Sequence, residues 1–268
     1  MENKPIGVFD SGIGGLTVLK EIMEVLPNED IVYFGDTARV PYGPRSKETV
    51  TKYTFQCINF LLTKNIKAIV IACNTATARS LKLAQEKYDV PIIGVVEAGA
   101  KTAVNVTKNK RVGVIGTEGT INSKAYETEI GKIDSNINTI GKPCPLFVPI
   151  VEEGWADTDI SYMAASRYLN DLKDKNIDAL VLGCTHYPLL MNTISKVMGS
   201  SVTLVNPARE TAKDLKNVLM KENLLRDQND NPKYEYYVSD GPDKFKQIGE
   251  NFLKKEIDNI NLVEIHKY

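Results

Sequence analysis

Two short apolar runs in this chain end in the same way, each at a cysteine. Residues 69–75 read IVIACNT and residues 180–186 read LVLGCTH, and a charged, helix-like stretch precedes each run. An apolar run of this length, bounded by polar residues, predicts a strand buried on both faces of a parallel sheet. Each cysteine then lies at the carboxyl end of its strand, where open α/β sheets bind their ligands. The pair predicts a site with two pseudo-symmetric halves, each presenting a thiol.

The first half of the chain alternates between expected strands and expected helices. Short apolar segments at 6–9, 31–34 and 91–96 predict strands, and helices are expected over 46–65 and 75–88. This alternation is typical of βαβ units, which form a mostly parallel sheet with right-handed crossovers.

The second half repeats this plan. Residues 7–12 align with residues 113–118 at an offset of 106, and the two cysteines of the apolar runs differ by 111 positions. The similar offsets predict an internal duplication with small loop changes. A further strand is expected over 146–151, with Glu152 and Glu153 at its carboxyl end.

These patterns predict an α/β fold of two pseudo-symmetric domains. Each is expected to be a mostly parallel sheet flanked by helices, with the active site in the cleft between them. The first domain is expected to comprise residues 1–97 and 210–268, and the second residues 98–209.

Composition limits the partners and the location of the protein. The chain has 268 residues, 43% of them hydrophobic, which is enough for two domains with a real core. A net charge of −1 gives no reason to expect a nucleic acid or an anionic membrane as partner. Because no stretch approaches the roughly 20 apolar residues of a membrane span, and residues 1–5 lack a signal-peptide core, we expect a cytoplasmic protein with free thiols.

Cys73 and Cys184 are the first candidates for chemistry. Each precedes an expected helix start, where backbone N–H groups and the helix dipole favour a thiolate. Polar neighbours, Asn74 and Thr75 after the first and Thr185 after the second, could hold a substrate carboxylate together with these N–H groups. A substrate between the thiols could lose a proton to one and gain a proton from the other.

The glycine-rich turn at residues 10–15, DSGIGG, is similar to a nucleotide-binding turn, but two of its features argue against nucleotide binding. The dinucleotide fingerprint needs glycine or alanine at its sixth place, where this chain has Thr17. Asp10 and Ser11 suit the amine and carboxylate of an amino acid better than a pyrophosphate.

Two further groups could support the thiols. His186 lies two residues after Cys184 and could tune that thiol or act on the substrate. Either Glu152 or Glu153 could pair with an ammonium group or with His186, although two glutamates in a solvated turn would look the same in the sequence. Cys73, Cys184 and His186 could also form part of a zinc site, but no further ligand with metal spacing is evident.

Several separate motifs, in order along the chain, make it resemble the glutamate racemase family of the cofactor-independent aspartate/glutamate racemase superfamily. The runs that carry the resemblance are DSGIGGL at 10–16, GDTAR at 35–39, PYGPR at 41–45, ACNTA at 72–76, GTEGT at 116–120 and GCTHYP at 183–188.

The resemblance implies a reaction and a set of residues. The reaction is the interconversion of L- and D-glutamate by two-base 1,1-proton transfer at Cα, with no cofactor and no metal. Cys73 is then the base toward D-glutamate and Cys184 the base toward L-glutamate, with Asp10, Glu152 and His186 as auxiliary acid–base groups. The expected substrate-holding residues are Asp10, Ser11, Tyr42, Gly43, Asn74, Thr75 and Thr185. The resemblance further implies a homodimer that supplies D-glutamate for peptidoglycan synthesis.

Other functions remain open at this point. One is an aspartate or other amino-acid racemase of the same superfamily. A second is a non-catalytic dicarboxylate-binding protein, which has no need of two opposed thiols, and a third is a thiol hydrolase using Cys184 and His186, which leaves Cys73 idle. The distal carboxylate of the substrate could be held by Arg39 or Arg45, or, as we prefer, by the helix start at Thr185.

Overall fold

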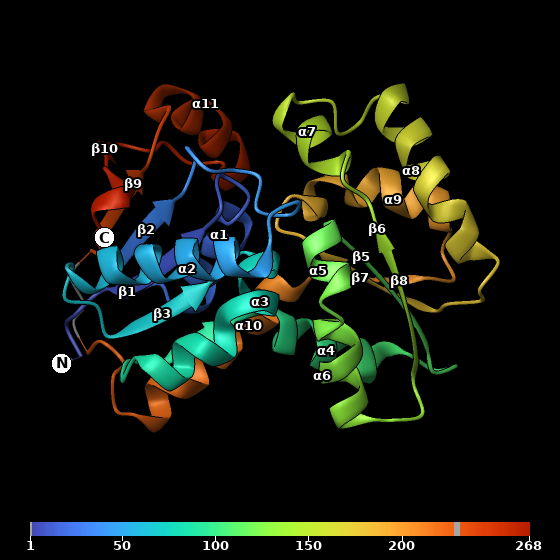
Figure 1. Ribbon diagram of the computed structural model, residues 1–268, viewed down its shortest axis with the longest axis horizontal. Coiled ribbons are helices and arrows are strands. Elements are labelled where there is room, and N and C mark those ends of the chain that lie inside the picture. The colour runs from blue at the N-terminus through green and yellow to red at the C-terminus, as the bar shows by residue number, and fades with distance from the viewer. Residues whose placement is uncertain (1, 228–230) are drawn as a thin grey trace.

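A computed structural model describes residues 2–227 and 231–268, which form two parallel sheets side by side (Figure 1). The first sheet has six strands in the order β10-β9-β2-β1-β3-β4, and the second has four in the order β6-β5-β7-β8. Every pairing between the described strands is parallel. The strands of the first sheet are β1 (Ile6–Asp10), β2 (Ile31–Gly35), β3 (Ala68–Ile71), β4 (Ile92–Gly94), β9 (Tyr234–Val238) and β10 (Ile260–Leu262). Those of the second are β5 (Arg111–Gly116), β6 (Asn138–Pro143), β7 (Ala179–Gly183) and β8 (Thr203–Val205).

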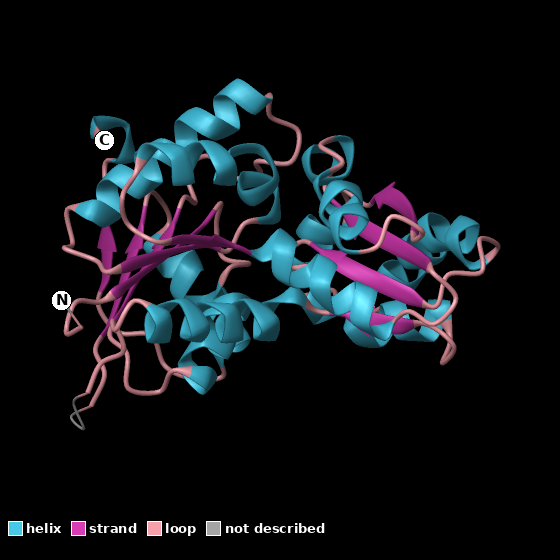
Figure 2. Cartoon of the chain, turned by 90° about the horizontal axis from the view of Figure 1, so that it is seen from below, coloured by secondary structure: helices cyan, strands magenta, loops and turns pink. Residues whose placement is uncertain are grey.

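Helices cover both faces of each sheet, as the edge-on view of Figure 2 shows. They are α1 (Leu16–Val25), α2 (Lys47–Leu62), α3 (Asn74–Lys87), α4 (Val95–Val106), α5 (Glu118–Asn122), α6 (Ala125–Ile133), α7 (Phe147–Glu152), α8 (Asp159–Lys173), α9 (Met191–Met198), α10 (Pro207–Lys221) and α11 (Pro242–Leu253), with short 3₁₀ turns at Tyr187–Leu190 and Ile265–Lys267. Within the described part of the chain, no helix has the length and apolar character needed to cross a membrane.

The α/β fold with two pseudo-symmetric halves is confirmed by the strand order. The run β2-β1-β3-β4 of the first sheet has the same order as β6-β5-β7-β8 of the second, with β1 matching β5 and β3 matching β7. After α10 the chain returns to the first sheet, so β9 pairs with β2 and both termini lie in the same half (Figure 1). The exact domain boundaries stay a prediction.

Alternation along the central strands supplies both faces of the first sheet with apolar side chains. All residues of β1 and β3 are buried. Ile6 and Val8 belong to one core cluster and Phe9 to another, because successive side chains of a strand point to opposite faces. Each such side chain removed from water contributes about 1.5–3 kcal/mol. This burial explains why the expected central strands form where the apolar runs lie.

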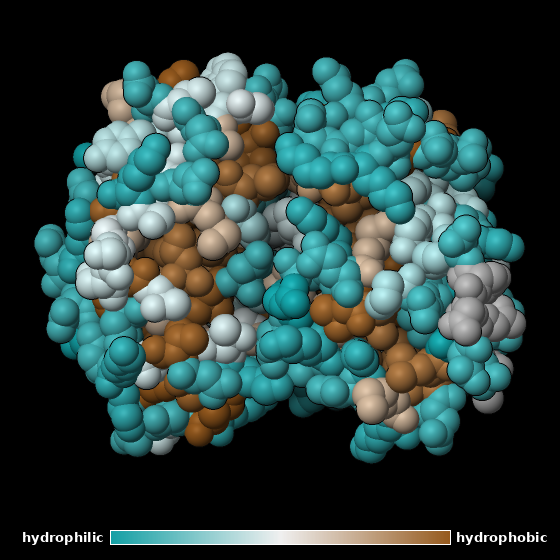
Figure 3. Space-filling view, turned by 180° about the vertical axis from the view of Figure 1, so that it is seen from behind, coloured by the Kyte–Doolittle hydropathy of each residue, from teal (hydrophilic) through white to brown (hydrophobic). Residues whose placement is uncertain are grey.

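Helices α4 and α10 join the two halves. β4 ends at Gly94 and α4 begins at Val95, so the strand expected over 91–96 is shorter than predicted. α10 packs against both α4 and α1. Lys101 of α4 reaches Glu210 at 3.1 Å, and Arg209 reaches Glu21 of α1 at 3.1 Å. Figure 3 shows this two-part shape from behind, with hydrophilic side chains over much of the surface and an outline indented between the halves.

The strand expected over 146–151 is wrong, because this segment is helix α7. Its buried residues, Phe147, Ile150 and Val151, recur at helical spacing and form one buried face. Pro149 has no N–H to donate to a sheet, yet it fits the first turn of a helix. A short apolar run cannot be assigned to strand or helix by its apolar character alone. Glu152 is therefore the last residue of α7 rather than the end of a strand.

Candidate active site

Both thiols of the apolar runs line one small cavity between the two sheets. The structure brings together there most of the expected residues, namely Ser11, Tyr42, Gly43, Cys73, Asn74, Thr75, Cys184, Thr185 and His186. The cavity holds about 20 Å³ of space, enough for roughly one water molecule. Residues from both halves contribute to the lining, so the site is closed by contact between the halves.

Cys73 caps the amino terminus of α3 and is a buried, neutral thiol. Its Sγ accepts from the Ala76 N–H at 3.5 Å and donates to Ser11 Oγ at 3.5 Å. Burial, and then the nearby Asp10 charge, raise the pKa of Cys73 to about 12. The hydrogen bond from the helix start does favour the thiolate, as expected, but desolvation outweighs it, so the net shift is toward the thiol.

Cys184 follows β7 and has a different neighbour. Its Sγ lies 3.9 Å from His186 Nδ1, and His186 Nε2 lies 3.0 Å from Glu152 Oε1. Burial alone would lower the pKa of His186, but the hydrogen bonds with Cys184 and Glu152 raise it to about 10. Burial likewise opposes ionisation of Glu152, yet the bond with His186 lowers its pKa. An imidazolium thus stands between a carboxylate and the second thiol.

Asp10 and Glu152 lie just outside the cavity rather than on its described lining. Asp10 Oδ2 accepts from the Gly12 N–H at 3.0 Å, and its Oδ1 accepts from Thr185 Oγ1 at 3.4 Å, across the boundary between the halves. Full burial raises the pKa of Asp10. Asp10 thus contacts the residue after Cys184 and acts on Cys73 through its charge, whereas the Glu152–His186 pair lies beside Cys184.

The loop that carries Tyr42 and Gly43 touches the second half directly. The Gly43 carbonyl accepts from the Gly119 N–H at 2.9 Å, and a Cβ at position 43 would lie 2.7 Å from Thr117 Cβ. This close approach requires glycine. Behind the loop, the Tyr42 hydroxyl donates to Asp36.

Neither candidate arginine is among the residues described as lining the cavity. Arg39 binds Asp36 at 2.6 Å and stacks its guanidinium 4.0 Å from the centre of the Tyr53 ring. The contacts of Arg39 are thus with Asp36 of its own loop and with Tyr53, and Arg45 is exposed.

Sequence reasoning missed Thr117, which lines the cavity, and Thr120 next to it. The Thr75 hydroxyl lies 2.8 Å from that of Thr117 and 3.2 Å from that of Thr120. The duplication contained a usable signal, because Thr117 follows Ser11 at the same offset of 106 that relates the glycine turns. Val40, Pro41 and Val148 also line the cavity and carried no signal of their own.

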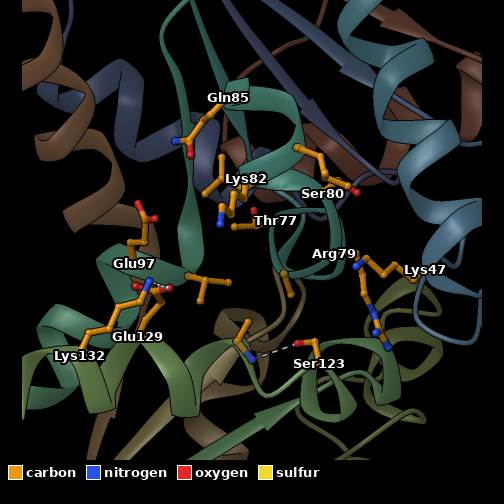
Figure 4. A pocket seen from close by; sticks show the side chains of 15 residues that line it. Lys47, Thr77, Arg79, Ser80, Lys82, Gln85, Glu97, Ser123, Glu129 and Lys132 are labelled. Carbon is orange, nitrogen blue, oxygen red and sulfur yellow. Dashed lines mark hydrogen bonds and ion pairs between the residues drawn. The ribbon is translucent and has the colours of Figure 1, made fainter. Parts of the chain in front are cut away.

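A much larger cavity, of about 540 Å³, lies elsewhere, between α3, α4 and α6 (Figure 4). Its charged lining residues are Lys47, Arg79, Lys82, Glu97, Glu129 and Lys132, and no cysteine lines it. Size alone therefore does not identify the chemical site. Among residues 2–227 and 231–268, no group of three or more His, Cys, Asp or Glu residues is placed to hold a metal ion.

The two repeated α/β halves each present a buried thiol to one cavity, from the ends of the matching strands β3 and β7. The chain belongs to the Asp/Glu/Hydantoin racemase family, whose model matches residues 6–215.

Curated relatives resemble this chain over its full length. It is 48% identical to a glutamate racemase of Geobacter metallireducens, over 98% of this chain and 97% of the relative. A glutamate racemase of Thermoanaerobacter pseudethanolicus is also 48% identical, with both chains covered completely.

Solved structures agree. The glutamate racemase of Francisella tularensis, crystallised with D-glutamate, matches with a TM-score of 0.94 and 45% identity, over 100% of both chains. An aspartate racemase of Picrophilus torridus, 21% identical with a TM-score of 0.56, covers 80% of this chain and 94% of its own, and shares the fold.

The His186–Glu152 pair predicts a pH dependence of stability. Because the folded pKa of His186 is raised above its ordinary value of 6.5, its contribution is fully present below pH 6.5 and is lost as pH rises toward about 10. We expect the melting temperature of the wild type to fall between pH 6.5 and 8.5 more steeply than that of His186→Gln. Thermal unfolding at several pH values measures this, with the exposed His266→Gln as control. Parallel curves for wild type and His186→Gln would contradict the assignment.

Proposed function

We propose that this protein interconverts L- and D-glutamate by two-base 1,1-proton transfer at Cα, using Cys73 and Cys184 and no cofactor. The observation that carries the proposal is the pair of buried thiols from matching strand ends on one cavity. The glutamate racemases that this chain resembles over its full length support the choice of substrate.

The reaction explains why two thiols are needed. One base alone returns the proton to the face from which it came, whereas two bases on opposite faces invert the centre. In the direction from L- to D-glutamate, the Cys184 thiolate takes the α-proton and the Cys73 thiol gives its proton to the other face. The reverse direction exchanges the two roles. The raised pKa of Cys73 suits the direction from L- to D-glutamate, in which this thiol starts as the acid.

The carbanion formed at Cα has to be stabilised by the protein's own polar groups. Asn74 and Thr75 begin α3 and hold one carboxylate of the substrate in this proposal. Thr185, which follows the second thiol, holds the other carboxylate. Thr185 remains our choice for the distal carboxylate, because Arg39 is committed to Asp36. Asp10 and the Glu152–His186 pair act as auxiliary groups for Cys73 and Cys184, and Ser11, Tyr42 and Gly43 complete the proposed substrate contacts.

A cavity of about 20 Å³ is far too small for glutamate, so substrate has to enter when the two halves part. We propose that the parts which separate are residues 1–97 with 210–268, and residues 98–209. Water is then excluded when the halves close, which strengthens the electrostatic contacts in the site.

The cellular role that we propose rests on the family resemblance. The protein acts in the cytoplasm as a homodimer and supplies D-glutamate for peptidoglycan synthesis and cell shape.

The function is tested with purified protein dialysed exhaustively against a chelator. We expect it to convert either enantiomer of glutamate to an equal mixture, followed by chiral chromatography. Aspartate lacks one methylene and is expected to react roughly 10–200-fold less efficiently. Activity that returns only with pyridoxal phosphate or zinc would exclude the proposed chemistry. A preference for aspartate would favour an aspartate racemase, and binding of glutamate without turnover would favour a dicarboxylate-binding protein.

A further inference from the structure

Tyr126 places a buried hydroxyl against a residue of the candidate active site. It is the second residue of α6, in the second half of the chain, and its hydroxyl donates to Asn74 Oδ1 at 2.7 Å. Asn74 begins α3 in the first half, directly after Cys73, and lines the cavity. Both side chains are almost completely buried, at 3% and 4% exposure. The bond therefore crosses between the halves at the position next to the first thiol.

Two glycines leave the space that the Tyr126 ring occupies. A Cβ at Gly99 of α4 would lie 2.9 Å from Tyr126 Cε1 and 3.0 Å from its hydroxyl oxygen. A Cβ at Gly183 of β7 would lie 3.2 Å from Tyr126 Cε2. Backbone thus confines the ring on two sides, so the fold sets the position of the hydroxyl oxygen.

The fixed hydroxyl determines which way the Asn74 amide turns. Burial raises the pKa of Tyr126, so the hydroxyl keeps its proton, and in the structure it donates this proton to Asn74 Oδ1. A carboxamide has an acceptor oxygen on one side and a donor NH₂ group on the other. With its oxygen bound to Tyr126, Asn74 has its NH₂ group left for the cavity. The opposite orientation would direct an oxygen toward a substrate carboxylate and repel it.

We propose that Tyr126 is a positioning residue, which holds Asn74 so that its NH₂ group donates to a carboxylate of the bound substrate. The inference rests on the proposed function, because it assigns a role within that site. Tyr126 itself is absent from the described lining of the cavity and acts only through Asn74.

Tyr126→Phe tests the inference, because it removes the hydroxyl and keeps the ring in its glycine-lined space. In this variant the orientation of the Asn74 amide is no longer fixed, so the amide binds a substrate carboxylate less well. The loss is the same in the ground state and in the transition state, and therefore KM rises while kcat stays nearly unchanged. We expect KM for glutamate to rise about tenfold and kcat to change less than about threefold. The matched control is Tyr88→Phe, which removes another tyrosine–asparagine bond, to Asn59 Oδ1 at 2.8 Å, outside the site. The control is expected to leave KM and kcat unchanged.

A double-mutant cycle separates positioning from a general structural effect. In an Asn74→Ala background there is no amide to orient, so Tyr126→Phe should raise KM no further. Asn74→Ala also leaves the Tyr126 hydroxyl buried without its partner, so the double variant should melt at a temperature no lower than Asn74→Ala alone.

The outcomes distinguish this inference from the proposed function. A wild-type protein that does not racemise glutamate would remove the proposed function. An active wild type whose Tyr126→Phe variant matches Tyr88→Phe would overturn the positioning role alone. The positioning role would also be overturned if the effects of Tyr126→Phe and Asn74→Ala on KM multiplied in the double variant. It would equally be overturned if Tyr126→Phe lowered kcat and left KM unchanged.

Discussion

Replacing either Cys73 or Cys184 with alanine is expected to reduce glutamate turnover below about a hundredth of the wild-type value, the loss that removal of a general acid or base commonly causes. Each thiol serves one face of Cα, so a single replacement removes the base in one direction and the acid in the other. At equilibrium the two enantiomers are equally stable, and therefore kcat/KM has to fall equally in both directions. Both variants should still bind glutamate, because Asn74, Thr75 and Thr185 remain.

A third buried cysteine provides the matched control. Cys144 is buried, and its Sγ lies 3.6 Å from the Lys142 carbonyl oxygen, away from the described lining of the small cavity. Cys144→Ala should keep near wild-type turnover. Initial rates with each enantiomer and titration calorimetry with glutamate test these expectations. If Cys73→Ala or Cys184→Ala keeps more than about a hundredth of the turnover, that thiol is not an essential base.

Gly14→Ala is expected to lower kcat/KM about a hundredfold, although the substitution adds a single methyl group. A Cβ at position 14 would lie 2.4 Å from Thr185 Oγ1 and 2.5 Å from His186 Nδ1. His186 cannot yield easily, because it is buried and bound to Glu152. The methyl group therefore displaces the segment after Cys184, and misplacement of catalytic groups by about 1 Å commonly costs this much.

Gly131→Ala is the control for this substitution. A Cβ at Gly131, within α6, meets nothing within 4 Å. It should leave kinetics unchanged and stabilise the helix by up to about 1 kcal/mol. Steady-state kinetics and thermal melting of both variants provide the comparison. A folded Gly14→Ala variant with wild-type kcat/KM would show that the contact of the glycine turn with Thr185 and His186 does not matter for catalysis.

Much of the fold could be predicted from the sequence, because fully buried parallel strands leave a clear apolar signal. The runs that end at Cys73 and Cys184 form β3 and β7, and the repeated offsets anticipated the matching strand order of the two sheets. The strand prediction for residues 146–151 was wrong because a six-residue apolar run fits one face of a helix as well as a buried strand. The side chains of α7 that pack into the core, Phe147, Ile150 and Val151, recur at helical spacing.

The positions of candidate site residues could be predicted where these residues adjoin a sequence motif. They were harder to predict where the site depends on contacts between the two halves of the chain. Asn74, Thr75 and Thr185 line the cavity beside their thiols as expected. Asp10 and Glu152 lie outside the described lining of the cavity and contact it through Thr185 and His186. The protonated state of Cys73 could not be foreseen, because it depends on burial between two halves that the sequence does not place.

The most direct test of the two-base account is racemisation of L-glutamate by the wild-type protein in heavy water. The α-hydrogen of early product and of recovered substrate is measured by mass spectrometry and proton magnetic resonance. The account predicts D-glutamate that carries solvent deuterium at Cα from the earliest time points, while unreacted L-glutamate keeps its protium. Early D-glutamate that retains the original α-hydrogen of the substrate would show that one base serves both faces and would contradict the account.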